Sequence, residues 1–166
     1  MKTKKSQTDL STFVIIAIAL LFLAPVALKI VNETLDGFST ALNETDPTAS
    51  ENVDYIHSTF VNFWDYLIIL GFFSLVVLLF ISSFLADTHP LFLIVYIFSA
   101  MLLIMFSPYM LEPVKEILGM TEFSDELGQI PLTSFMIQKF NLILLGLIVV
   151  TGIIMYAKFR GRNSDL

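Results

Sequence analysis

Cysteine is absent from this chain of 166 residues. Without thiols the protein can form no disulfide, thiolate nucleophile, iron–sulfur cluster or cysteine zinc site. The absence does not decide the compartment, because a chain without thiols is compatible with oxidising and reducing surroundings alike. Charge is also scarce, at 14% of the residues, and the net charge of −6 excludes a general basic surface for nucleic acid, so we predict no specific nucleic-acid binding.

Long stretches of the chain carry no Asp, Glu, Lys or Arg. Each is about long enough, at 1.5 Å per residue, to cross roughly 30 Å of hydrocarbon once its interfacial ends are counted. The apolar runs are continuous, whereas barrel strands would alternate in segments of about ten residues. We therefore predict an all-α integral membrane protein with four transmembrane helices. The uncharged stretches are 12–28, 67–86, 91–111 and 142–157, and the predicted spans are approximately 12–31, 63–86, 90–111 and 137–158.

Residues 1–166 are predicted to form one four-helix membrane domain, because the connections leave too little chain for a separate soluble domain. The basic start and first apolar run also resemble a secretory signal peptide. That run is longer than a usual signal core, however, and Pro25 would occupy the −3 position if cleavage followed Ala27. A retained anchor is the favoured interpretation.

The basic residues gather at the two ends of the chain. Short flanks rich in Lys and Arg stay on the cytoplasmic side during insertion, and four spans return the chain to its starting side. We expect both termini on the cytoplasmic or inner side (N-in, C-in), with two acidic loops facing outward. Such a face would attract cations or a basic partner protein. The terminal cations are Lys2, Lys4, Lys5, Lys158, Arg160 and Arg162, and the outward connections are 32–60, which has no Lys or Arg, and 112–138.

Several boundaries follow from caps and prolines. The first helix is expected to begin near Leu10 or Ser11, and the last near Thr133 or Ser134. Asp87-Thr-His-Pro90 is a tight inner hairpin between the second and third spans. Glu112-Pro113 marks the exit of the third span. One or two short interfacial helices are expected between Val114 and Leu127.

The polar stretch from 32 to 50 has two interpretations. It is either a loop, or a continuation of the first helix on the apolar face formed by Leu35, Phe38 and Leu42, until Asp46-Pro47 breaks it.

Asp65 is the deepest acidic residue in the predicted spans. Its neighbours Trp64 and Tyr66 are expected to be interfacial anchors, which places Asp65 at the outer interface. It is therefore either a hydrated or hydrogen-bonded interfacial residue, which is favoured, or a proton or cation site. His57 is the second residue of this candidate polar site. Its spacing to other ligand residues supports no metal site, and no catalytic motif occurs, so we predict neither an enzyme nor a cofactor.

Asn32-Glu-Thr and Asn43-Glu-Thr both match the acceptor pattern for N-glycosylation. Each is either a modified site or a solvated polar segment. Of the two, Asn43 is the better placed, because Asn32 lies close to the bilayer.

The chain begins with Lys2-Thr-Lys-Lys5, turns at Asp87-Thr-His-Pro90, has Pro131-Leu-Thr133 before the last helix and ends near Lys158-Phe-Arg160. In this overall pattern it resembles the small multi-spanning membrane proteins of tailless icosahedral viruses with an internal membrane. The resemblance implies a structural role, in which the protein organises a bilayer and meets a protein shell.

The leading hypothesis is thus a non-catalytic multi-pass protein of a cytoplasmic or viral internal membrane with a structural or assembly role. It would contact the lipid bilayer and pack as a homo-oligomer or with membrane or capsid partners. The alternatives are a holin-like protein, a small transporter or channel subunit, or an accessory subunit of a membrane complex.

Overall fold

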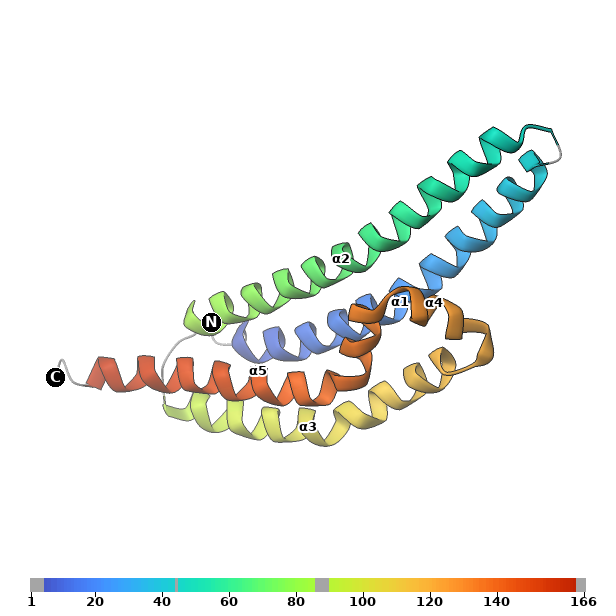
Figure 1. The fold of residues 1–166 in the computed structure, drawn as a ribbon. Coiled ribbons are helices and arrows are strands. Elements are labelled where there is room, and N and C mark those ends of the chain that lie inside the picture. Colours follow the sequence, from blue (N-terminus) through green and yellow to red (C-terminus); the bar gives the residue numbers. More distant parts are fainter. Residues whose placement is uncertain (1–4, 44, 86–89, 164–166) are drawn as a thin grey trace. The chain divides into compact units, whose positions relative to one another are not determined.

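The computed structural model describes residues 5–43, 45–85 and 90–163 of the chain (Figure 1). These residues form helices and no strand. The order is α1 (Lys5–Asn43), α2 (Pro47–Leu85), α3 (Pro90–Leu118), a 3₁₀ turn η1 (Thr121–Phe123), α4 (Ser124–Gln129) and α5 (Pro131–Asn163).

Within the described ranges, four helices are long and apolar enough to cross a membrane. This confirms the predicted helical class and the presence of four membrane-length segments, and it is compatible with an integral membrane protein. The predicted inner hairpin with Asp87 and His89 lies outside the described residues. The four apolar helices cover Leu10–Asn43, Thr48–Leu85, Leu93–Leu118 and Pro131–Lys158.

The helices α1 and α2 are much longer than the predicted spans 12–31 and 63–86. Each contains 39 residues, which corresponds to about 58 Å at 1.5 Å per residue. The helix α1 begins by Lys5 rather than near Leu10 or Ser11, and residues 32–43 continue it to Asn43. Of the two interpretations of residues 32–50, the helical continuation is therefore correct and the loop is wrong.

Local chemistry explains where this helical hairpin turns. The side chain of Asp46 accepts the backbone amides of Thr48 and Ala49 at 3.1 and 3.2 Å, so it caps α2. Pro47 occupies the first helical position, where its missing amide costs nothing. The turn therefore needs only Thr45 and Asp46 among the described residues.

The second long connection is also mostly helical. α3 continues through Pro108 and Pro113 to Leu118, so the predicted exit at Glu112-Pro113 does not end the helix. It stops at Gly119, where an added Cβ would lie 2.9 Å from the carbonyl oxygen of Lys115. Two short helical segments are present as η1 and α4, but the residues from Val114 to Leu118, which were also expected in such segments, belong to α3. The helix α5 begins at Pro131 rather than near Thr133 or Ser134.

Backbone contacts group the chain into two units. Unit 1 comprises Met1–Ile18, Phe72–Pro113 and Lys139–Leu166, and unit 2 comprises Ala19–Gly71 and Val114–Gln138. The long helices contribute to both units, so this grouping does not test whether residues 1–166 form a single domain, and that assignment stays a prediction.

The interior of unit 1 contains aromatic and hydroxyl contacts between its helices. The rings of Phe13 in α1 and Phe72 in α2 meet edge to face at 6.0 Å. The buried hydroxyl of Tyr96 in α3 donates to the carbonyl of Ile148 in α5 at 2.9 Å and bonds the hydroxyl of Thr151. The buried hydroxyl of Tyr96 is thus bonded to a neighbouring helix.

The core of unit 2 is built from Leu28, Val61 and Ile130, with Phe60 and Trp64 packed against it. These residues come from α1, α2 and the residue before α5. The polar side chains described next lie in this unit.

Candidate functional site

Asp65, in α2, is buried and bound to the beginning of α5. Its carboxylate Oδ2 accepts the backbone N–H of Leu132 at 3.0 Å. Its Oδ1 accepts the backbone N–H of Thr133 at 2.9 Å and the hydroxyl of Thr133 at 2.7 Å. Both carboxylate oxygens are therefore engaged, although only 4% of the residue is exposed.

The first turn of α5 explains this arrangement. A helix leaves its first amides without intrahelical partners, and its N-terminus carries a partial positive charge. The residue before Pro131 is Ile130, whose side chain has no acceptor atom, so α5 has no cap of its own there. Asp65 supplies both the acceptors and the negative charge from another helix.

A second set of contacts joins α1, α2 and α4 around Asn32, which is 7% exposed. The Nε2–H of His57 donates to the amide oxygen of Asn32 at 2.7 Å, and the Asn32 amide nitrogen donates to Oε1 of Gln129 at 3.2 Å. The other imidazole nitrogen, Nδ1, lies 3.8 Å from a carboxylate oxygen of Asp36. His57 and Asp65 thus contact different partners, and each ties α2 to another segment.

Lys29 fastens the η1 turn to α1. Its Nζ donates to the carbonyl of Glu122 at 2.7 Å, lies 5.1 Å from the ring centroid of Phe123 and is 3.7 Å from Oε1 of Glu33. Local sequence patterns did not predict this contact with η1, because Glu122 is 93 positions away from Lys29. The cation over the aromatic ring and the bond to a carbonyl hold a turn that has few buried side chains of its own.

Hydroxyl and carboxylate groups also connect the two arms of the α1–α2 hairpin. The Ser39 hydroxyl donates to Oδ1 of Asp54 at 2.8 Å and lies 2.9 Å from the Ser50 hydroxyl. These bonds continue the contact between α1 and α2 beyond the apolar core of unit 2.

The two predicted interfacial anchors differ in their surroundings. The indole N–H of Trp64 donates to the carbonyl of Ala24 at 3.1 Å, and its ring stacks on Phe60 with centroids 5.6 Å apart. Tyr66 is 67% exposed. Trp64 therefore joins α2 to α1, while Tyr66 projects from the helix pair.

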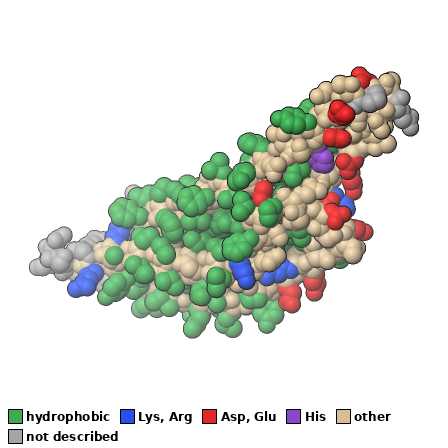
Figure 2. Space-filling model, viewed as in Figure 1, with side chains coloured by type: hydrophobic (Ala, Val, Ile, Leu, Met, Phe, Trp, Pro, Cys, Tyr) green, Lys and Arg blue, Asp and Glu red, His purple; other side chains and the backbone are tan. Residues whose placement is uncertain are grey.

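The acidic residues of unit 2 are of two kinds. Figure 2 shows acidic side chains gathered over the α1–α2 hairpin, and the exposed ones there include Glu33, Asp36, Asp46, Glu51 and Asp54. Glu126 in α4 is only 8% exposed, and its Oε2 has no hydrogen-bond partner among the described residues. Over the same residues, no group of three or more His, Cys, Asp and Glu side chains is arranged to hold a metal ion.

The two sequons also differ in the structure. Asn32 is buried, and its amide is committed to His57 and Gln129. Asn43 is the exposed last residue of α1.

No family model matches the chain, and no characterised protein or solved structure is significantly similar to it.

Proposed function

We propose that the protein is a non-catalytic, multi-pass membrane protein with a structural or assembly role, and that it packs in a bilayer with copies of itself or with partner proteins. The observation that carries the proposal is the state of Asp65. Conduction through a span requires a polar group that can release and rebind ions or protons. Both oxygens of Asp65 instead accept the first amides of α5, which is a structural use of the charge.

Two contacts of charged residues along α2 support the proposal that the segment of α2 between them crosses the hydrocarbon of a bilayer. Asp65 lies at one end of this segment. At the other end, Nζ of Lys158 donates to the carbonyl of Phe84 at 2.7 Å and lies 5.7 Å from its ring centroid. The stretch of α2 from Asp65 to Phe84 measures about 28 Å at 1.5 Å per residue, close to the hydrocarbon thickness of a bilayer.

Side chains within this segment of α2 fit contact with lipid or with another membrane helix. Many large apolar residues of α2 are exposed there, and this would be unfavourable in water. They include Leu67, Leu70, Phe73, Leu78, Ile81 and Phe84.

The proposed orientation has both termini on the cytoplasmic or inner side and the α1–α2 hairpin outside. The terminal cations favour it. The absence of cysteine permits a direct test with single substitutions. In oriented membranes, Thr48→Cys should react with a membrane-impermeant maleimide, Arg160→Cys should react only after permeabilisation, and Leu78→Cys should stay protected. Labelling of Arg160→Cys from outside would contradict the orientation.

Reconstitution tests the structural role itself. The purified protein in liposomes should release no more trapped ions than empty liposomes do, and mild detergent should extract it as an oligomer or a defined complex. A steady flux that Asp65→Asn abolishes, with the fold retained and with Glu116→Gln unaffected, would favour the channel or transporter alternative. Large leaks that appear only above a threshold amount of protein would favour a holin.

A further inference from the structure

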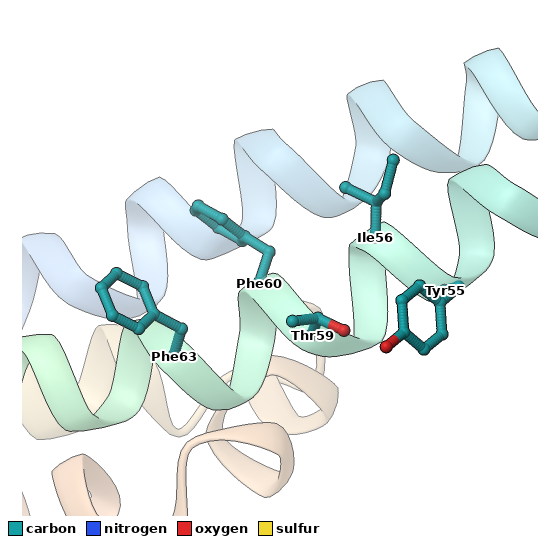
Figure 3. Close-up of a pocket in the computed structure, with 5 residues that line it drawn as sticks. All are labelled: Tyr55, Ile56, Thr59, Phe60 and Phe63. Carbon is teal, nitrogen blue, oxygen red and sulfur yellow. The ribbon is translucent and has the colours of Figure 1, made fainter.

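The hairpin has an open aromatic groove on α2. Its lining residues are Tyr55, Ile56, Thr59, Phe60 and Phe63, all from one helix (Figure 3), and they surround about 270 Å³. Ile56, Phe60 and Phe63 follow one another at steps of four and three residues, so they form one stripe along the helix. We call these five residues the aromatic groove.

Most of the aromatic groove is exposed. The exposed fractions are 73% for Tyr55, 59% for Ile56 and 61% for Phe63. Phe60 is partly buried, because it packs against the core of unit 2 and stacks on Trp64. The groove therefore has a fixed floor and apolar walls that nothing in the chain's described residues covers fully.

The bilayer is not thick enough to cover the outer part of this groove with lipid. If Asp65 marks the edge of the hydrocarbon, Ile56 lies about 13 Å further along α2. The headgroup region adds only about 5–8 Å on each side of the hydrocarbon. Ile56 and Tyr55 would then project beyond the lipid, where an apolar surface favours a protein partner.

Charge narrows the choice of partner. The sequence contains no Lys or Arg from Ile30 to Val114, and Glu33, Asp36, Asp46, Glu51 and Asp54 are exposed on the hairpin. A second copy docked through the same hairpin would bring these like charges together, at a cost in free energy. A cationic partner would instead be attracted by these carboxylates.

We propose that the aromatic groove binds a basic amphipathic helix of a partner protein. The apolar face of that helix fills the groove between Tyr55 and Phe63, and its Lys and Arg side chains face the hairpin carboxylates such as Glu51. This is the helix-in-groove mode of peptide recognition, with aromatic residues as anchors. The inference rests on the assembly role proposed above, to which it adds the chemistry of the partner.

Trp64 provides a built-in reporter for the test. It is the only tryptophan in the chain, and its ring stacks on Phe60 in the groove floor. The full-length protein in nanodiscs of neutral lipid is titrated with an 18-residue helical peptide of Leu and Lys. We expect a saturable change in Trp64 emission, and a peptide with Glu in place of Lys should bind at least tenfold more weakly.

Variants locate the binding surface. Phe63→Ala and Tyr55→Ala should each weaken binding of the Leu/Lys peptide about tenfold, as expected for truncated aromatic anchors. Glu51→Gln should weaken it mainly at low salt, because the charge contribution is screened as ionic strength rises. Tyr109→Ala removes an equally exposed aromatic residue from α3 and should leave binding unchanged.

Two results would overturn the proposal. One is an equal response to the Lys and Glu peptides, or an equal response of the native chain and Phe63→Ala, because the signal would then come from the bilayer. The other is strong quenching by headgroup-labelled nitroxide lipid in a chain with Trp64→Phe and Tyr55→Trp, which would show that lipid covers the groove. Either result leaves the assembly role to be judged by the liposome assay, which does not involve the groove.

Discussion

The carboxylate of Asp65 binds both the backbone N–H and the hydroxyl of Thr133, so a residue of α2 is the N-terminal cap of α5. The cap replaces the side-chain acceptor that Ile130 cannot supply. It also explains how a carboxylate that is 4% exposed can be tolerated at the proposed edge of the hydrocarbon, because a buried charge is stable when its lone pairs are used.

Removing this cap should destabilise the protein. Asp65→Ala leaves the first amides of α5 without an acceptor and should lower the free energy of unfolding by about 2 kcal/mol. Asp65→Asn keeps one acceptor oxygen and should cost about half as much. Thermal unfolding in a mild detergent measures both, with Glu116→Gln as an exposed control. Equal stability of Asp65→Ala and the native chain would show that the cap contributes nothing.

Glu126 should behave in the opposite way. It is a buried carboxylate whose Oε2 has no hydrogen-bond partner among the described residues. Glu126→Gln keeps the shape and removes the charge, so it should raise the free energy of unfolding by about 1 kcal/mol. The matched control is Glu122→Gln, an exposed acid in the adjoining turn, which should change little. A loss of stability on Glu126→Gln would mean that the carboxylate binds a partner.

The apolar spans were predictable, because hydropathy over about twenty residues is a local property. The helical ends of α1 and α2 were harder, because Asn, Thr, Ser and Asp between 32 and 50 are typical of loops. In the structure, the hydroxyls of Thr34 and Thr40 donate to the carbonyls of Ile30 and Asp36 within α1. Asn32 and Ser39 instead bond to side chains of α2. A polar composition therefore marked a surface rather than a break in the helix.

The contacts of the candidate site were not predictable from local patterns. Asp65 and Thr133 are 68 positions apart, and the sequence gives no register between α2 and α5. One signal was present: Ile130-Pro131 combines a good first helical residue with a residue that cannot cap. A helix start of this kind indicates an acceptor elsewhere in the chain, and Asp65 was the only acid near a predicted span edge with aromatic neighbours.

His57 and Asn32 should show coupled effects on stability. His57→Ala and Asn32→Ala each remove the 2.7 Å bond between α2 and α1, so the double variant should lose less than the two single losses together. We expect a coupling free energy of about 0.5–1.5 kcal/mol. As a control, Asn32→Ala combined with Thr40→Ala should be additive, because the hydroxyl of Thr40 donates to the carbonyl of Asp36 within its own helix. Additive effects of the first pair would show that the bond does not form.

Glycosylation should distinguish the two sequons. In a eukaryotic secretory host we expect one glycan, on Asn43, because Asn43 is exposed whereas Asn32 is 7% exposed and its amide is bonded to His57 and Gln129. Intact mass should show a single glycan that Asn43→Gln removes and Asn32→Gln retains. The same result would place the hairpin on the outer side, whereas a glycan on Asn32, or none, would contradict the prediction.

Within unit 1, Tyr96 and Gly152 lie where α3 contacts α5, and substitutions at these two residues test what holds the two helices together. Tyr96→Phe removes the bonds to the carbonyl of Ile148 and the hydroxyl of Thr151, so it should lower the free energy of unfolding by about 1 kcal/mol.

A Cβ at Gly152 would lie 3.5 Å from a ring carbon of Tyr96, which is ordinary van der Waals contact. Gly152→Ala should therefore be tolerated and, through its better helix propensity, should stabilise by up to about 1 kcal/mol. Thermal unfolding of both variants in the same detergent measures the two effects. If Gly152→Ala were instead destabilising while Tyr96→Phe had no effect, close backbone approach rather than the hydroxyl network would hold α3 against α5.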